Sequence, residues 1–312
     1  MNSLPRLISR AHLSSKHFKL PSLVSPALAR SLTTIQPSNQ TWSNSSSKSF
    51  LGAFAASLLV GTSIAVCDAQ EKGKKAEDFK LYQYRICPFC NRVKAYLDFL
   101  KIPYEAIEVN PLTKSEIKFS KEYKKVPIAL LAGNDDLSTQ TIADSKLIID
   151  YITDNFVKGN PSINPSFIAS DSDYWNEWSE KKLAVLLYPN ITRSFEESFE
   201  CFNYSENVEQ WNVLERKAVH WVGAVAMLGA NGKIKKKYNI VDEREDLFKI
   251  LTEWTDAVGD KPFLHGDSVT LPDLLVYGVL RSIESFRTFN DIMAKNSELS
   301  AWYQRVAKQV NH

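Results

Sequence analysis

Residues 81–111 read LYQYRICPFCNRVKAYLDFLKIPYEAIEVNP and contain the pattern that decides the fold. The alternating, aromatic-rich residues 79–85 predict a β-strand, and the apolar spacing after Pro88 predicts a helix over 88–100. Residues 104–109 predict a second strand, parallel to the first if the helix is a crossover between them. The segment therefore predicts a βαβ unit with a Cys-X-X-Cys motif where its helix begins.

The following residues complete a small α/β domain. We expect helix or loop over 113–122 and a β-hairpin with strands at 127–131 and 138–142. A final helix is expected over 144–155. A βαβ unit followed by ββα is the order of a thioredoxin-like domain, which we place at 79–157.

The rest of the chain has helical periodicity and almost no strand signal. A linker rich in Gly, Asn, Pro and Ser covers 158–170, and an all-α domain covers 171–312. The helices are expected at 171–187, 193–201, 207–237, 243–258, 272–284 and 288–310. The predicted fold class is an α/β thioredoxin-like domain followed by an all-α domain similar to the C-terminal domain of glutathione transferases.

The N-terminal segments differ in composition from both domains. Residues 1–49 contain 13 serines and no Asp or Glu, which is typical of a mitochondrial presequence; a disordered tail is the alternative. Residues 50–67 form an uncharged stretch of 18 residues, near the lower limit for a membrane anchor; a presequence end or a weakly ordered segment is the alternative. With 68–78 as a linker, we expect a mitochondrial, membrane-associated protein, or else a single-pass protein of the Golgi or another endomembrane.

Composition excludes several classes of protein. With 44% hydrophobic residues among 312, the chain can bury a sizeable core. Four cysteines are too few for a disulfide scaffold, and the five histidines share no short motif with each other or with a cysteine, so no metal site is predicted. Residues 1–67 carry six basic residues and no acidic one, whereas the rest of the chain has more acidic than basic residues. We therefore expect no nucleic-acid partner.

The Cys87-Pro88-Phe89-Cys90 motif carries the predicted chemistry. At a helix start, Cys87 lies near unpaired backbone N–H groups and the positive end of the helix dipole, which favour a thiolate. Pro88 suits the first turn because its missing N–H has no partner there. Cys90 lies one turn further on the same face and can resolve a mixed disulfide formed at Cys87. Half of a zinc site is the alternative, but the sequence has no second Cys or His pair.

Two further segments fit binding of glutathione by a thioredoxin-like domain. Val126 and Pro127 precede a strand where such folds hold a cis proline, which would leave the Val126 backbone to pair with an extended peptide. Asp144 and Ser145 open the last helix of the domain. The Ser145 hydroxyl and helix N–H groups could hold the γ-glutamyl carboxylate, and Asp144 the amine. A plain N-cap is compatible with the same residues.

A capping box is expected at Thr270-Leu271-Pro272-Asp273, where the Thr hydroxyl caps a backbone N–H and Asp273 reaches back. We interpret it as structural.

Together these residues resemble the membrane-associated prostaglandin E synthase type 2 family. The resemblance rests on 81–111, on EIKFSKEYKKVPI at 116–128, on ADS at 143–145 and on weaker matches such as YPNITRSFEESFECF at 188–202. It implies a homodimer that isomerises prostaglandin H2 to prostaglandin E2 with Cys87 as the active thiol. It also implies that Tyr84 and Phe89 border the pocket, and that glutathione binds at the residues named above.

The resemblance also implies a haem bound through the glutathione sulfur, but here the chain departs from the family. Lys182, Val185 and Tyr188 occupy the stretch where the family tends to carry histidines. Lys233 and Lys237 stand where the family has arginines and are the remaining candidates for anion or haem contacts. We therefore expect glutathione as the cofactor and a weak haem site at most.

Three functions compete on this reasoning. The first is isomerisation of the lipid endoperoxide. The second is a mitochondrial glutathione-dependent thiol–disulfide oxidoreductase or transferase acting on a disulfide. The third is a membrane-tethered module that binds glutathione or haem without catalysis. The presence of Cys90 favours the oxidoreductase over a pure binder, because binding alone needs no resolving thiol.

Overall fold

The computed structural model describes residues 78–132 and 139–311. The predicted presequence at 1–49, the predicted anchor at 50–67 and nearly all of the linker at 68–78 lie outside this part of the chain. Within the described residues, no helix combines the length and the apolar character needed to cross a bilayer.

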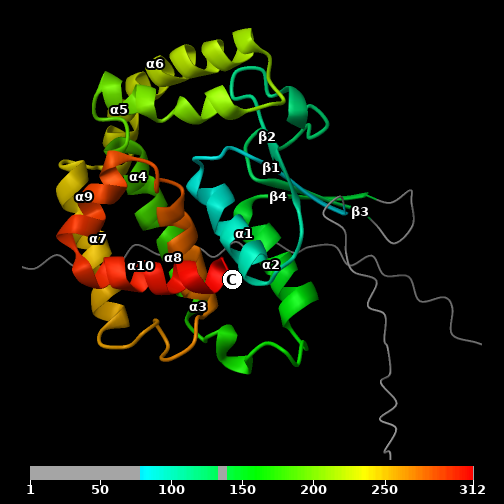
Figure 1. The fold of residues 1–312 in the computed structure, drawn as a ribbon, viewed down its shortest axis with the longest axis vertical. Helices are drawn as coiled ribbons and strands as arrows, with labels where there is room; N and C mark the ends of the chain where they lie inside the picture. The colour runs from blue at the N-terminus through cyan, green and yellow to red at the C-terminus, as the bar shows by residue number, and fades with distance from the viewer. Residues whose placement is uncertain (1–77, 133–138, 312) are drawn as a thin grey trace, which may run out of the picture. The chain divides into compact units, whose positions relative to one another are not determined.

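The N-terminal domain is a four-stranded sheet with the order β2-β1-β3-β4 (Figure 1). Strand β1 (Phe79–Gln83) pairs in parallel with β2 (Glu105–Glu108) and antiparallel with β3 (Ile128–Ala132), and β3 pairs antiparallel with β4 (Thr139–Ala143). Helix α1 (Pro88–Phe99) makes the crossover, and α2 (Ser145–Ile152) follows β4. The predicted thioredoxin-like order is therefore confirmed.

The C-terminal domain consists of helices. They are α3 (Ser172–Trp178), α4 (Ala184–Asn190), α5 (Phe195–Glu200), α6 (Val213–Tyr238), α7 (Glu243–Val258), α8 (Leu271–Arg281), α9 (Arg287–Lys295) and α10 (Ser297–Val310). Short π or 3-10 turns are η2 (Ser115–Ile117), η3 (Thr153–Val157), η4 (Pro165–Phe167), η5 (Ser179–Leu183) and η6 (Asn203–Asn207).

Two expected helices begin or break at an asparagine. The helix expected over 207–237 begins only at Val213, because the Asn212 side chain accepts a hydrogen bond from Glu215 N–H in a capping box. The helix expected over 288–310 is two helices, since Asn296 has an extended backbone and caps α10 by accepting from Leu299 N–H at 2.9 Å. The expected helix or loop at 113–122 contains only η2.

Helix α1 lies between the sheet and α8 and joins the two domains (Figure 1). A Cβ on Gly278 of α8 would stand 2.6 Å from the Arg92 Cα and the Asn91 carbonyl oxygen, so only glycine allows this approach. The fully buried Arg92 side chain forms an ion pair with Glu180 at 3.3 Å. The predicted linker at 158–170 also packs against α1, because the Phe167 ring stacks on the Phe99 ring with their centroids 5.4 Å apart. The position of α1 is thus fixed from both sides.

Candidate active site

The turn from β1 into α1 holds Cys87 at the helix start. Cys87 is the N-cap of α1 and is followed by Pro88. The Cys87 N–H donates to the Tyr84 carbonyl oxygen at 3.0 Å. The buried Asn91 side chain donates to the carbonyl oxygens of Arg85, at 2.8 Å, and of Cys87, at 3.0 Å. Asn91 was not predicted from the sequence, although its position four residues after Cys87 suits this contact. The turn is fixed by hydrogen bonds on both sides of the thiol.

The two cysteines of the motif differ in exposure and in acidity. Both are free thiols; Cys87 is partly exposed and Cys90 is completely buried. A hydrogen bond with the Cys90 side chain lowers the pKa of Cys87, aided by the backbone N–H groups of Cys90 and Phe89. Burial, followed by the bond to Cys87, raises the pKa of Cys90 well above its ordinary value. These opposite pKa shifts favour Cys87 as the thiolate and Cys90 as the protonated partner.

A buried carboxyl group supports the same turn. Glu108, at the end of β2, accepts a hydrogen bond from Arg85 N–H at 2.8 Å and one from Gln83 Nε2 at 3.2 Å. Burial raises the pKa of Glu108 from its ordinary 4.5 to about 7. Sequence reasoning missed Glu108 because only the pairing of β2 with β1 brings it behind the motif.

We expect Glu108→Gln to change how stability depends on pH. Unfolded Glu108 ionises near pH 4.5, whereas the folded group ionises near 7. The contribution of protonated Glu108 to the free energy of unfolding is therefore complete below the unfolded pKa and is lost as the pH rises through 7. Between pH 5 and pH 8, the melting temperature of the wild type should therefore decrease more than that of Glu108→Gln. Equal differences in the two proteins would show that Glu108 is already ionised at pH 5.

The predicted proline segment lies beside the thiols. The Val126–Pro127 peptide bond is cis, which confirms that prediction. Val126 is buried in a small cluster that includes Cys90 and is packed against by Cys87, Tyr84 and Tyr123. The structure therefore brings Val126 to the motif from a distant part of the sequence.

Asp144 and Ser145 begin α2 on the same side. The Asp144 N–H donates to the Pro127 carbonyl oxygen at 3.2 Å, and the Asp144 carboxylate caps α2 by accepting from Lys146 N–H at 2.9 Å. Ser145 is buried. Burial raises the pKa of Tyr123, and the charges of Asp144 and Cys87 add to that rise. Tyr123 was not singled out from the sequence, which carries no signal for it.

An apolar cavity of about 340 Å³ opens beside Cys87. Its walls are formed by Tyr84, Ile86, Cys87, Pro88, Phe89, Pro111, Ala184, Leu187, Tyr188, Ile191, Phe202, Tyr204, Met227, Ser282 and Ile283. Both domains contribute to these walls, and the predicted border residues Tyr84 and Phe89 are among them. Burial raises the pKa of Tyr84 to about 12, so its hydroxyl remains protonated at neutral pH. The cavity suits an apolar substrate held next to a thiol and a phenol.

The haem contacts do not assemble at this cavity. Lys233 and Lys237 are exposed on α6 and do not line it. Lys182 forms an ion pair with Glu253 at 3.1 Å, and the Tyr188 hydroxyl donates to the Met227 carbonyl oxygen. Among the described residues, the cavity walls carry no basic side chain for a propionate and no histidine. These residues do not fit a haem.

Comparisons with known proteins agree with this geometry. The family profile of the glutathione S-transferase N-terminal domain matches residues 81–161, and that of the C-terminal domain matches 215–305. The two matches confirm the predicted fold class and agree with glutathione as the cofactor. A crystal structure of glutathione transferase Omega 3C from Trametes versicolor superposes with a TM-score of 0.47 at 17% identity, covering 77% of this chain and 86% of that one.

Two curated relatives carry a more specific description. Prostaglandin E synthase 2 from Mus musculus is 32% identical over 74% of this chain and 70% of its own length. Prostaglandin E synthase 2 from Danio rerio is 31% identical over 74% of this chain and 71% of its own length. On the identity and coverage of these two relatives, this chain belongs to the prostaglandin E synthase 2 family.

Proposed function

We propose that the protein is a glutathione-dependent thiol enzyme that isomerises prostaglandin H2 to prostaglandin E2. The observation that carries the proposal is a thiol of lowered pKa, Cys87, in the wall of an apolar cavity that also contains a protonated phenol, Tyr84. The names of the Mus musculus and Danio rerio relatives support the choice of substrate.

The reaction needs no net oxidant. The Cys87 thiolate forms a bond to one peroxide oxygen, the O–O bond breaks, and the other oxygen takes a proton from Tyr84 to become a hydroxyl. Tyrosinate then removes the hydrogen from the carbon that carries the sulfur-bound oxygen. A carbonyl forms as the S–O bond breaks, and both the thiolate and the phenol are restored.

Glutathione is proposed to lie on the Val126 and Asp144 side of Cys87. The Val126 backbone would pair with the tripeptide, and the α2 N-terminus with Ser145 would hold the γ-glutamyl carboxylate. Asp144 would pair with the amine. The hydrogen bond from Asp144 N–H to Pro127 joins the two halves of this site.

We expect Asp144→Asn to weaken glutathione binding about tenfold, which corresponds to about 1.4 kcal/mol. Asparagine removes the charge for the amine but can still accept the hydrogen bond from Lys146 N–H, and it has the shape of aspartate, so it adds no new steric conflict at this position. Asp144→Ala should bind at least as weakly and also melt earlier, because the cap is lost. Titration calorimetry and melting curves measure both. Unchanged glutathione affinity in both variants would show that the amine lies elsewhere.

The full chain, assayed with prostaglandin H2 in the presence and absence of glutathione, tests the proposed activity directly. Product formation that needs Cys87 supports the isomerisation, and its loss without glutathione supports the dependence on glutathione. If prostaglandin H2 is not converted but a mixed disulfide of glutathione is reduced, the thiol–disulfide oxidoreductase is the correct function. The buried Cys90 favours this second function, because Cys87 packs against the small cluster that contains it and a resolving thiol therefore lies near the first.

A further inference from the structure

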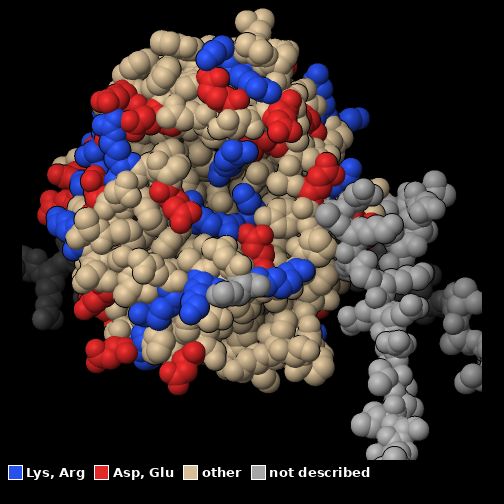
Figure 2. Space-filling model, in the orientation of Figure 1, with Lys and Arg blue, Asp and Glu red and all other residues tan. Residues whose placement is uncertain are grey.

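A second cavity, of about 900 Å³, lies next to the thiol cavity. The two share Ile86, Tyr204 and Ser282 in their walls, so they adjoin at these residues. Its remaining walls come mainly from α1, α8, α9 and the segment around η6, with Arg85, Tyr104 and Glu200 from other elements. None of the predicted glutathione-binding residues lines it. Figure 2 shows Lys and Arg side chains gathered in a hollow over α1.

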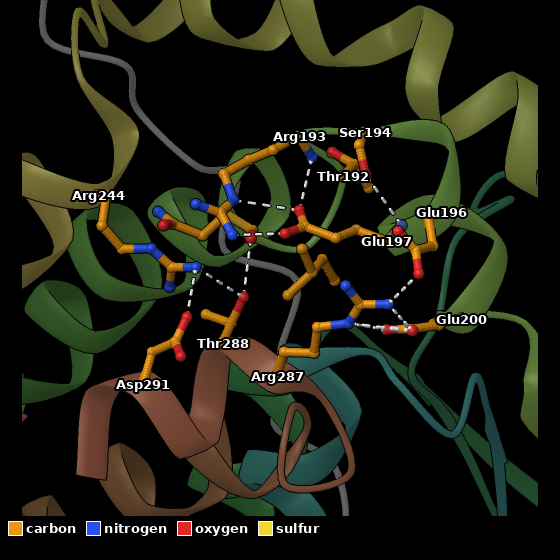
Figure 3. Close-up of polar contacts among 12 residues, drawn as sticks. Thr192, Arg193, Ser194, Glu196, Glu197, Glu200, Arg244, Arg287, Thr288 and Asp291 are labelled. Atoms are coloured by element: carbon orange, nitrogen blue, oxygen red, sulfur yellow. Dashed lines mark hydrogen bonds and ion pairs between the residues drawn. The ribbon is translucent and has the colours of Figure 1, made fainter. Parts of the chain in front are cut away.

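Two of the four basic residues in these walls are neutralised by neighbours. The Arg281 Nη1 atom donates to the Asp98 carboxylate at 2.7 Å. Arg287 donates from Nε to both Glu200 carboxylate oxygens, at 3.0 and 2.9 Å, and from Nη2 to Glu196 at 2.7 Å (Figure 3). Arg281 and Asp98 balance each other, and Arg287 with its two glutamates carries one net negative charge, so neither arginine is left unpaired for an anionic ligand.

The other two basic residues, Lys94 and Arg85, have no ion pair with a carboxylate among the described residues. Lys94 is half-buried on α1, and burial followed by the nearby Arg281 charge lowers the pKa of its ammonium group. The Arg85 guanidinium lies 5.9 Å from the centre of the Tyr204 ring, at the partition between the cavities. The unpaired carboxylate in these walls, Glu284, is exposed. Within the described part of the chain, the inner wall therefore contains two basic side chains without an ion-paired carboxylate, whereas the group around Arg287 has an excess carboxylate.

We propose that this cavity holds the carboxylate of a fatty-acid-like ligand at Lys94, with the apolar chain of that ligand in the thiol cavity. The inference rests on the proposed function for the reaction at Cys87, but the binding of the acid does not require that reaction. Lys94 is the half-buried cation of these walls without an ion-paired carboxylate among the described residues, so the proposal places the ligand's carboxylate there.

The position of Lys94 fits this arrangement. Lys94 follows Cys87 by seven residues on α1, which is about two turns and a rise of about 10 Å. A chain whose reactive group is separated from its carboxylate by several methylenes can reach from the thiol to the ammonium group. A carboxylate at Lys94 also offsets the unfavourable burial of an unpaired ammonium group.

The test compares a C20 polyunsaturated acid with its methyl ester, which has the same chain without the charge. Binding to the full-length protein is measured by titration calorimetry. We expect the wild type to bind the acid at least tenfold more tightly than the ester. Lys94→Met should lose most of this preference while binding the ester and glutathione as the wild type does. Lys94→Arg should retain it.

Lys308→Met is the matched control, because Lys308 is an exposed lysine near the end of α10 and lines neither cavity. It should bind both probes like the wild type. Equal affinity of the wild type for acid and ester, or an unchanged preference in Lys94→Met, would overturn the inference. An alkyl phosphate that binds more tightly than the carboxylate of equal chain length, and depends on Lys94, would overturn the choice of a carboxylate.

These outcomes separate the inference from the proposed function. If the acid binds through Lys94 but prostaglandin H2 is not isomerised, the proposed function fails and the carboxylate site stands. If prostaglandin H2 and its methyl ester are isomerised with equal KM, and Lys94→Met changes neither, the proposed function stands and the carboxylate site fails.

Discussion

Cys87→Ser is expected to lower the rate of prostaglandin H2 isomerisation by at least about a hundredfold, because a serine hydroxyl is not ionised where the thiol is. Glutathione affinity should change little, since Val126, Asp144 and Ser145 remain in place. Turnover is measured under glutathione saturation, with binding measured separately by calorimetry. If Cys87→Ser retains wild-type turnover, glutathione itself supplies the attacking sulfur and the proposed role of Cys87 is wrong.

Cys90→Ala is the companion variant and should behave differently. The Cys90 hydrogen bond is the largest cause of the lowered pKa of Cys87. Its removal should therefore move the labelling of Cys87 by iodoacetamide to higher pH and reduce isomerase activity at neutral pH. Isomerase activity should recover at higher pH, because the reaction itself needs one thiol. Cys90→Ala that labels at the same pH as the wild type would show that the α1 N-terminus alone sets the acidity of Cys87.

The local parts of the site could be predicted from the sequence, but their buried neighbours could not. The strand, the turn and the first helical residues around Cys87 follow from periodicity and from Pro88. Glu108 and Tyr123 carry no such signal. Glu108 reaches the turn at Arg85 because β2 pairs with β1, and Tyr123 packs against the cluster around Cys90 because the segment before Pro127 folds back onto the motif.

The helical domain shows the same limit in its boundaries. The amphipathic period runs through 288–310, so it predicts one helix, whereas Asn296 ends that continuity by capping α10. The sequence Asn296-Ser297-Glu298 is compatible with a helix start, but the continuous apolar spacing on both sides of it favours one helix. By contrast, the predicted capping box at 270–273 is confirmed, because Thr270 and Asp273 bond reciprocally at the start of α8.

Asp273 does more than the capping box predicted. Its carboxylate is fully buried and accepts four hydrogen bonds. Two come from the Thr270 N–H and hydroxyl, at 3.0 and 2.8 Å. The others come from Leu264 N–H, at 3.0 Å, and from the Trp302 indole N–H, at 2.9 Å. One side chain therefore connects the start of α8 with α10 and with the loop before α8.

Asp273→Ala is expected to lower the free energy of unfolding by about 3–5 kcal/mol, because each buried donor left without an acceptor costs about 1–3 kcal/mol and partial relaxation recovers some of that. Since a domain of this kind is stable by only about 5–15 kcal/mol, the loss should be visible in urea unfolding followed by tryptophan fluorescence. Trp302→Phe removes one donor and leaves the other three paired, so it should cost less.

Asp242→Ala is the matched control: Asp242 caps α7 through Arg244 and Glu245 N–H groups but is exposed. Water can replace an exposed cap, so its loss should be about 1 kcal/mol. Equal losses in Asp242→Ala and Asp273→Ala would show that Asp273 acts as a cap alone and that its bonds to Leu264 and Trp302 add nothing to the stability of the domain.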